Sequence, residues 1–246
     1  MGSRAEICRA AEIVKAPDCR SPDAEKGENG SLDLEEQIMT MRARIHDGKL
    51  FTDYCEGLEE DRLKAKKLMK AYNETDPEDV KGRERLLEEI MGKPVKAWVE
   101  PPFYFCYGSN ISIGEGSYLN FNCNFIDDGK ITIGEKVMFG AGVTIATVGH
   151  PVCPDLREYM YTDPVVIEDN CWIGAAVTIC PGVRIGKNSV IGAGSVVTKD
   201  IPENSVAVGN PCRVVREISE KDWKYYYKDR EITKEDLEEE RKLRRQ

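Results

Sequence analysis

An aliphatic residue recurs every six positions through the second half of the chain. The series runs without a skip through Ile167, Ile173, Ile179, Ile185, Ile191 and Val197. Neither a helix nor an ordinary alternating strand sustains a period of six. A parallel β-helix does, because each hexad supplies one short strand and one turn, with the aliphatic side chain facing inward. The sequence therefore predicts triangular coils of three hexads, and random aliphatic spacing in a β-sandwich would need several coincidences in phase.

The same period extends upstream and is interrupted there. It runs through Ile113, Leu119 and Phe125, shifts by two residues around Asp127 and Asp128, and resumes at Ile133, Phe139 and Ile145. Residues 146–164 then break it completely. An interruption inside a regular stack predicts a loop extruded from one coil, and such loops often carry function. This loop contains His150, one of only two histidines in the chain.

Composition divides the chain into four predicted regions. Residues 1–38 are polar and mixed in charge, which predicts a flexible N-terminal extension. Residues 39–100 form a helical N-terminal region, and residues 101–216 form the β-helix with its extruded loop. Residues 217–246 are a C-terminal tail that ends in a nearly all-charged stretch, typical of a solvated helix.

The helical region contains two apolar stripes at helical spacing. The first helix is expected within residues 39–73, with Leu58, Ala65 and Tyr72 on its apolar face. The second is expected to start at Asp76 as N-cap, with Pro77 in its first turn, and to end at Gly92. Together they predict a cap over the open N-terminal end of the β-helix.

Charge and cysteine usage exclude several classes of protein. The net charge of −9 argues against nonspecific nucleic-acid binding. The nine cysteines include no CxxC pair, so neither a metal site nor a closed disulfide framework is predicted; Cys123 and Cys171 fit small core positions. No long apolar run indicates a membrane helix or a secretory signal. Free thiols fit a reducing compartment, so we expect a cytoplasmic protein.

One stretch of the acidic chain is basic. Residues 184–216 contain five basic and two acidic side chains, a local excess of three positive charges. This excess points to an anionic small ligand, although plain surface charge is the simpler alternative for each residue. His150 is likewise open to two interpretations. A lone loop histidine is more often solvated than catalytic, but its place in a broken coil favours a general base.

The chain resembles a known family, the hexapeptide-repeat acyltransferases, and within it the galactoside and maltose O-acetyltransferase branch. The resemblance covers about residues 41–230. It is carried by the segments Gly48-Lys49-Leu50-Phe51-Thr52-Asp53, Trp98-Val99-Glu100-Pro101-Pro102, Asn120-Phe121-Asn122, Gly149-His150-Pro151-Val152, Asn170-Cys171-Trp172-Ile173-Gly174 and Gly192-Ala193-Gly194-Ser195-Val196-Val197-Thr198-Lys199-Asp200. The resemblance implies a left-handed β-helix that assembles as a homotrimer, with active sites between neighbouring subunits.

The resemblance also implies an acetyl-CoA-dependent transfer to a sugar hydroxyl, with no metal. His150 takes the place of the family's catalytic base, and Glu158 is the candidate carboxylate that orients it. Because the loop is shorter than in the family, Tyr159 could instead occupy the position of that carboxylate. The acceptor positions are Asp53, Arg62, Cys106, Asn120 and Asp128, and the acetyl-CoA positions are Trp172, Ala175, Ala193, Thr198, Lys199, Arg213 and Arg216. Cys106 replaces a serine of the galactoside enzymes, which leaves the sugar open.

Three alternatives accompany this interpretation. The acceptor could be a xenobiotic alcohol or an amino sugar. The chain could also be a β-helix binding scaffold without catalysis. A γ-type carbonic anhydrase would need three zinc-binding histidines, and this chain has two, with His46 outside the predicted coils.

Overall fold

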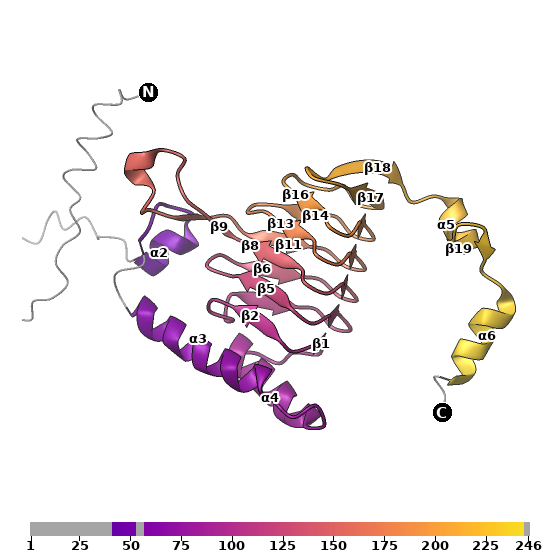
Figure 1. Cartoon of the computed structure of the whole chain (residues 1–246), viewed down its shortest axis with the longest axis horizontal. Coiled ribbons are helices and arrows are strands. Elements are labelled where there is room, and N and C mark those ends of the chain that lie inside the picture. The colour runs from indigo at the N-terminus through magenta and orange to yellow at the C-terminus, as the bar shows by residue number, and fades with distance from the viewer. Residues whose placement is uncertain (1–40, 53–56, 244–246) are drawn as a thin grey trace, which may run out of the picture.

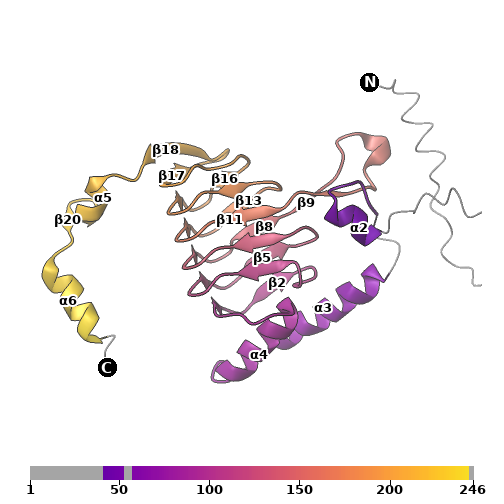
Figure 2. The ribbon, with the colours of Figure 1, turned by 180° about the vertical axis from the view of Figure 1, so that it is seen from behind.

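The computed structural model describes residues 41–52 and 57–243; the predicted extension 1–38 lies outside the described residues. Figure 1 shows a column of stacked coils with helices across one end and a C-terminal arm extending from the other. The reverse view in Figure 2 shows the same arrangement from behind. The predicted parallel β-helix is confirmed, because strands from successive coils pair in parallel.

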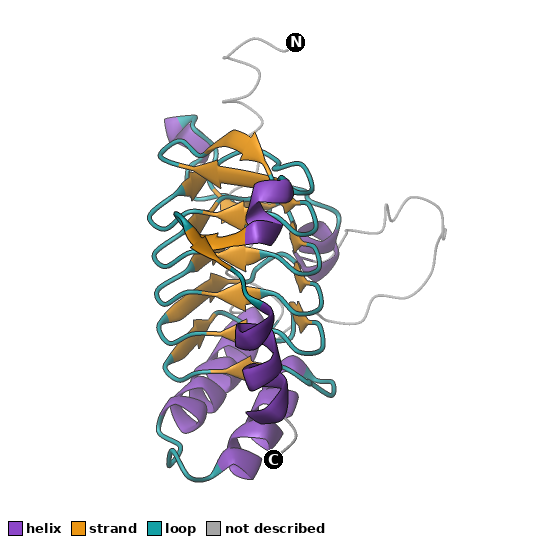
Figure 3. Ribbon diagram, turned by 90° about the vertical axis from the view of Figure 1, so that its right-hand side faces the viewer, coloured by secondary structure: helices purple, strands orange, loops and turns teal. Residues whose placement is uncertain are grey.

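The coils have three faces, each a sheet of short strands stacked one above another (Figure 3). Face 1 contains β1 (Trp98–Val99), β4 (Tyr118–Leu119), β7 (Met138–Phe139), β12 (Trp172–Ile173), β15 (Val190–Ile191), β17 (Ser205–Val208) and the antiparallel β18 (Arg213–Glu217). Face 2 contains β2 (Phe103–Phe105), β5 (Cys123–Ile126), β8 (Thr144–Ala146), β13 (Thr178–Ile179) and β16 (Val196–Val197). Face 3 contains β3 (Ile111–Ile113), β6 (Ile131–Ile133), β11 (Val165–Ile167) and β14 (Arg184–Ile185).

Turns between the faces form vertical columns, which we call corners. Corner 1–2 joins face 1 to face 2 and contains residues 100–102, 120–122, 140–143, 174–177 and 192–195. Corner 2–3 joins face 2 to face 3 and contains residues 106–110, 127–130, 147–164, 180–183 and 198–200. The two corners lie at opposite ends of every strand of face 2.

The repeated aliphatic side chains fill the interior of the column. Ile167, Ile173, Ile179, Ile185, Ile191 and Val197 are all fully buried. Cys123 and Cys171 are buried among them as small core residues, as predicted. Each interior position lies above its equivalent in the next coil, for example Ile179 between Ile145 and Val197. Stacking therefore supplies a continuous apolar core that a single coil could not bury.

The corner that joins face 3 to face 1 is stabilised by hydrogen bonds between side-chain amides. Asn170, Asn188 and Asn204 occupy equivalent turn positions and have φ values of 57, 62 and 55°. Asn170 donates to Asn188 at 3.0 Å, and Asn188 donates to Asn204 at 2.8 Å. Asparagine tolerates the left-handed conformation, so the same residue type satisfies both the turn and the stacking between coils.

The helices differ from the prediction in two places. The expected helix within 39–73 is divided into α2 (Met41–His46) and α3 (Leu58–Asn73). Between them Phe51 pairs antiparallel with Met160, so tertiary pairing prevails over helical propensity there. The N-cap of α4 (Val80–Met91) is Asp79 and not Asp76, because the Asp79 carboxylate accepts the Gly82 N–H at 2.9 Å.

The predicted cap and the helix end at Gly92 agree with the structure. Gly92 adopts φ 66°, a left-handed conformation that glycine accommodates readily. The α3 helix packs against β2 of the first coil (Figure 1). Tyr72 donates its hydroxyl hydrogen to the carbonyl of Val99 at 2.7 Å. Asn73 both donates to and accepts from the backbone of Phe103.

Two segments leave the column. The extruded loop, predicted at residues 146–164, covers residues 147–164, because Ala146 still pairs within β8. It contains β9 (Val148–Gly149) and β10 (Tyr161–Thr162) as an antiparallel ribbon and a short 3₁₀ turn at Pro154–Leu156. The C-terminal arm contains α5 (Glu220–Lys224), β19 (Tyr225–Tyr227), β20 (Arg230–Glu231) and α6 (Lys234–Leu243). Within the residues that the structure describes, no helix has both the length and the apolar character needed to span a membrane.

Candidate active site

A residue of α3 meets a residue of corner 2–3 beneath the extruded loop. Nη2 of Arg62 lies 3.1 Å from Oδ1 of Asp128, whose side chain is only 5% exposed. The Arg62 guanidinium also lies 5.3 Å from the centre of the Tyr107 ring, within cation–π range. The structure thus brings two predicted acceptor residues, from segments far apart in sequence, into direct contact.

Cys106 lies beside this pair, and a carboxylate that sequence analysis missed holds it in place. Asp127 is fully buried and accepts the backbone N–H groups of Cys106, Tyr107 and Gly108 at 2.8, 2.9 and 2.7 Å. Burial raises the pKa of Asp127 to about 6 in spite of these three hydrogen bonds. Its sequence signal was the two-residue shift of the hexad period at Asp127 and Asp128.

The Cys106 thiol is not a nucleophile in this environment. Burial, followed by the negative charges of Asp128 and Asp127, raises the pKa of Cys106 to about 12. A thiol with such a pKa stays neutral at pH 7, and the thiolate is the reactive form. Cys106 therefore presents a neutral, weakly hydrogen-bonding group to anything that binds beside Asp128.

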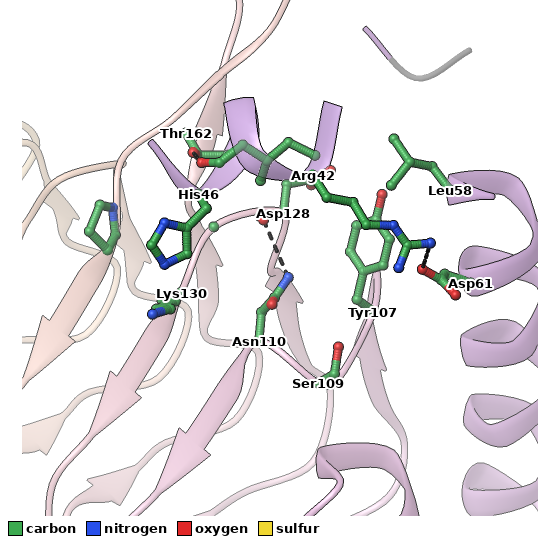
Figure 4. Close-up of a pocket in the computed structure, with 13 residues that line it drawn as sticks. Arg42, His46, Leu58, Asp61, Tyr107, Ser109, Asn110, Asp128, Lys130 and Thr162 are labelled. Carbon is green, nitrogen blue, oxygen red and sulfur yellow. Dashed lines mark hydrogen bonds and ion pairs between the residues drawn. The ribbon is translucent and has the colours of Figure 1, made fainter. Parts of the chain in front are cut away.

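A pocket of about 450 Å³ opens between α2, α3 and corner 2–3 (Figure 4). Its lining residues are Arg42, Ile45, His46, Leu58, Asp61, Tyr107, Ser109, Asn110, Asp128, Gly129, Lys130, Thr162 and Pro164. Most of them are polar, and the volume lies within the usual range for small-molecule sites. Asp128 connects this pocket to the Arg62–Cys106 cluster. Asp53, the other predicted acceptor residue of this region, lies outside the described residues.

The extruded loop presents His150 with one ring nitrogen fixed. Nδ1 of His150 lies 2.9 Å from the carbonyl oxygen of Arg157 and 3.0 Å from that of Tyr159. Carbonyl oxygens only accept hydrogen bonds, so Nδ1 carries the hydrogen and Nε2 keeps its lone pair. The geometry therefore sets the tautomer in which Nε2 can accept a proton.

The orienting contact comes from the backbone on both sides of Glu158. The Glu158 side chain is exposed, and no hydrogen bond or ion pair joins its carboxylate to another residue of the described ranges. Tyr159, the alternative position, contributes its carbonyl oxygen to His150 and not its side chain. In this chain two carbonyl groups hold the imidazole at the place where a carboxylate was expected.

The extruded loop is tied to the helical region of the same chain. Phe51 and Met160 exchange two backbone hydrogen bonds of 2.9 Å each. The Thr162 hydroxyl donates to the carbonyl of Ile45 at 2.7 Å. These contacts join the segment that carries His150 to α2, which forms one wall of the pocket.

A second group of predicted residues lies at the opposite corner. Ala175 and Ala193 are exposed in successive turns of corner 1–2, and Trp172 is 53% exposed on face 1 next to them. Gly174 permits the close stacking, because a Cβ there would lie 2.5 Å from the backbone nitrogen of Ala193. The neighbours Gly174 and Ala176 use their N–H groups within the column, whereas the Ala175 N–H has no acceptor among the described residues.

Asn120 belongs to this second group and not to the Asp128 cluster. It lies in corner 1–2, in the turn after β4, whereas Asp128 lies in corner 2–3, in the turn after β5. The Asn120 Oδ1 accepts the N–H of Phe121 at 2.8 Å, which matches its alternative role as a turn-stabilising residue. A single chain therefore does not bring all the predicted acceptor residues together.

The predicted phosphate contacts lie in two places. Thr198 and Lys199 are exposed at the C-terminal end of corner 2–3, whereas Arg213 and Arg216 are exposed on β18 of face 1. Arg216 forms a two-pronged ion pair with Asp222, at 2.7 and 2.8 Å. This pairing holds the pKa of Asp222 well below its usual range, so Arg216 is partly committed to the C-terminal arm.

Two family models match parts of the chain. The maltose acetyltransferase hexapeptide capping motif matches residues 44–94, and the hexapeptide repeat of succinyl-transferase matches residues 164–199. The galactoside O-acetyltransferase of Escherichia coli K12 is 53% identical over 197 residues, which cover 79% of this chain and 97% of that protein. The galactoside O-acetyltransferase of Lactococcus lactis is 44% identical over 187 residues, or 74% of this chain and 90% of that protein.

Solved structures agree with these relatives. A galactoside acetyltransferase in complex with coenzyme A superposes with a TM-score of 0.72 at 49% identity, covering 79% of this chain and 99% of that one. A maltose O-acetyltransferase from Clostridium difficile 630 superposes with a TM-score of 0.72 at 44% identity, covering 74% and 98%. The sequence identities, the helical cap and the β-helix therefore support the same family assignment. The chain belongs to the galactoside and maltose O-acetyltransferase family of hexapeptide-repeat acyltransferases.

Proposed function

We propose that this chain transfers the acetyl group of acetyl-CoA to a hydroxyl of a sugar or glycoside, with His150 as general base. The observation that carries this proposal is the pair of carbonyl contacts on Nδ1, which leaves Nε2 of His150 as a proton acceptor. Family membership supports the reaction class. A free sugar hydroxyl is a weak nucleophile at pH 7, so a positioned base is needed.

The proton path follows from the tautomer. Acetyl-CoA supplies an activated acetyl thioester. His150 Nε2 takes the hydroxyl proton as the acceptor oxygen bonds to the acetyl carbon, and it returns that proton to the sulfur as the carbon–sulfur bond breaks. The carbonyl groups of Arg157 and Tyr159 stabilise the imidazolium that exists between these two transfers.

Corner 1–2 suits the donor. The exposed Trp172 ring can wall the acyl arm, and the small exposed side chains of Ala175 and Ala193 leave room for it beside the ring. The unused N–H of Ala175 can donate to the thioester oxygen as negative charge develops there. Thr198, Lys199, Arg213 and Arg216 remain the proposed contacts to the polar and phosphate groups of the donor.

The acceptor is proposed to bind at the Arg62–Asp128 cluster. Asp128 and Asp53 would accept hydrogen bonds from sugar hydroxyls, Arg62 would donate to ring or hydroxyl oxygens, and Cys106 would contact the sugar as a neutral thiol. Asn120 would join this site from another subunit, because it lies at the other corner of its own chain.

We further propose a homotrimer. Trp98, Tyr118, Met138 and Trp172 form an apolar stripe down face 1 and are 43, 36, 52 and 53% exposed. A neighbouring copy would cover this stripe and bring its corner 2–3 against corner 1–2, which completes the site. Sedimentation of the intact protein tests this; a stable monomer with full activity would contradict it.

Compartment is part of the same proposal. Six cysteines of the described residues are free thiols, namely Cys106, Cys123, Cys153, Cys171, Cys180 and Cys212. Free thiols persist in reducing environments, which supports a cytoplasmic location.

The central experiment is thiol release from acetyl-CoA with a panel of sugars and glycosides. His150→Ala should lower turnover by about 10²–10⁴-fold while acetyl-CoA still binds in calorimetry. Turnover near the wild-type rate would remove His150 from the mechanism. Turnover only with xenobiotic alcohols or amino sugars would favour the other acceptor classes. Absence of acetyl-CoA binding would favour a scaffold.

A further inference from the structure

Among the residues that the structure describes, the pocket beside Asp128 contains one positive charge that no acidic side chain balances. Three of its basic side chains have acidic neighbours: Arg42 pairs with Asp61 at 2.7 Å, Arg62 at its edge pairs with Asp128 at 3.1 Å, and His46 lies 3.4 Å from Asp47. Lys130 is the exception. Its side chain is exposed on the pocket wall, and its ammonium group makes no hydrogen bond or ion pair with any residue in the described ranges.

The fold places Lys130 at this wall. Lys130 follows Gly129, whose backbone N–H donates to the hydroxyl of the fully buried Thr147 at 2.8 Å. Its own carbonyl oxygen accepts the N–H of Val165 at 3.0 Å, where the chain returns from the extruded loop. The backbone on both sides of the lysine is therefore fixed. Figure 4 shows Lys130 and His46 on the same side of the pocket.

The pocket wall also contains the neutral polar side chains of Ser109 and Asn110, among apolar residues and two paired carboxylates. The Ser109 hydroxyl is exposed and makes no hydrogen bond within the described part of the chain. The Asn110 amide is already used, because its Nδ2 donates to the carbonyl of Asp127 at 2.7 Å. The pocket thus combines a free hydroxyl, a fixed amide and an unbalanced ammonium within about 450 Å³.

We propose that this pocket binds the non-reacting part of an acceptor that carries an anionic group, a carboxylate, sulfate or phosphate attached to the sugar or to its aglycone. Lys130 contacts the anion, His46 flanks it, and Ser109 binds a neighbouring hydroxyl. The inference rests on the proposed function and narrows its substrate class. An ammonium group attracts an anion more strongly in a partly enclosed pocket than in water. It contributes little binding free energy to a neutral acceptor.

The test compares acceptors that differ only in charge. One pair is para-carboxyphenyl and para-carbamoylphenyl galactoside, with the anion on the aglycone. The other is a galacturonate glycoside and its amide, with the anion on the sugar. For each acceptor kcat/KM is measured at low and high salt in wild type, Lys130→Gln and Lys130→Glu. Lys81→Gln, an exposed lysine of α4, is the matched control.

We expect the carboxylate of at least one pair to be preferred about three- to tenfold, the size of a partly exposed charge contact. High salt and Lys130→Gln should remove most of that preference, and Lys130→Glu should reverse it. Lys81→Gln should leave the preference as in wild type. Equal kcat/KM within both pairs, or a preference that survives Lys130→Glu, would overturn the inference.

Failure of the proposed function gives a different result. If no acceptor is acetylated, the function is wrong, and binding of the same four compounds to the wild-type protein is measured by calorimetry. Tighter binding of the anionic compound of either pair, if Lys130→Glu removes it, would still support an anion-binding pocket. Equal binding within both pairs, or none, would overturn it.

Discussion

The Asp127→Asn substitution tests how the acceptor cluster is held. Asp127 accepts three backbone N–H groups, two at Oδ1 from Cys106 and Tyr107 and one at Oδ2 from Gly108. An asparagine can keep the two contacts at its single oxygen. Its Nδ2 then faces the Gly108 N–H, so that two buried donors oppose each other.

The expected loss of stability follows from these contacts. One buried N–H and one buried amide group lose their partners, and each unsatisfied buried group costs about 1–3 kcal/mol. We therefore expect the free energy of unfolding at pH 7.5 to fall by about 2–6 kcal/mol. The Michaelis constant of the sugar should rise more than that of acetyl-CoA, because Cys106 and Tyr107 belong to the acceptor cluster.

The effect should depend on pH with a definite sign. Burial raises the pKa of Asp127 from 3.8 to about 6 in the folded protein. A raised carboxyl pKa means that the folded state binds more protons than the unfolded state between these values. Its contribution to stability is therefore fully present below the unfolded pKa and is lost as the pH rises through about 6. Asparagine does not titrate. The difference in the free energy of unfolding between wild type and variant should therefore be about 1–1.5 kcal/mol larger at pH 5 than at pH 7.5.

Urea unfolding at equal protomer concentration measures the gap at both pH values. Asp76→Asn is the matched control, since Asp76 is exposed and accepts one backbone N–H, from Glu78. It should change stability by about 0.5 kcal/mol or less. A gap for Asp127→Asn that stays constant or widens toward pH 7.5 would refute the raised pKa. A gap below about 1 kcal/mol would refute the account of the hydrogen bonds.

Three further substitutions test other parts of the molecule. Ile179→Asp should abolish folding, because it buries an unpaired charge in the middle of the column, and native circular dichroism would contradict this. Lys199→Ala and Arg216→Ala should raise the Michaelis constant for acetyl-CoA more than for a donor lacking the 3′-phosphate; equal effects on both donors would reject the phosphate contacts. Asp53→Ala should weaken the sugar about ten- to a hundredfold with little change for acetyl-CoA, and unchanged sugar kinetics would exclude Asp53.

The fold was largely predictable because its signal is local and repeated. Each interior aliphatic residue indicates one strand, and an unbroken series of them is compatible with few other folds. Helix boundaries were less predictable. Asp76 and Asp79 are both suitable N-caps, but Asp76 forms a turn with Glu78, and only Asp79 reaches the N–H of Gly82. The non-helical stretch around Phe51 depends on its pairing with Met160, which no local pattern reports.

The sequence pattern pointed to only part of the candidate site. His150 stood out because it occupies the break in the repeat, whereas Asp128 was placed at the acceptor site only by the family resemblance. The period shift marked the position of Asp127 but not its buried role, and no pattern marked His46 or Lys130. Their roles depend on burial and on the packing of α2 against corner 2–3, which arise only in the folded chain.

The proposed donor and acceptor sites depend on different parts of the fold. The loop that carries His150 is tied to α2 by the Thr162–Ile45 hydrogen bond and to the segment after α2 by the Phe51–Met160 pairing, so the proposed base and one wall of the pocket belong to one unit. Trp172 and Ala175 belong instead to the repeating column, where every turn is fixed by its neighbours. A change of the exposed Lys130 or His46 side chain alters the pocket without replacing a buried residue of that column. Acceptor specificity can therefore change by substitutions in the pocket wall while the proposed acetyl-CoA groove stays constant.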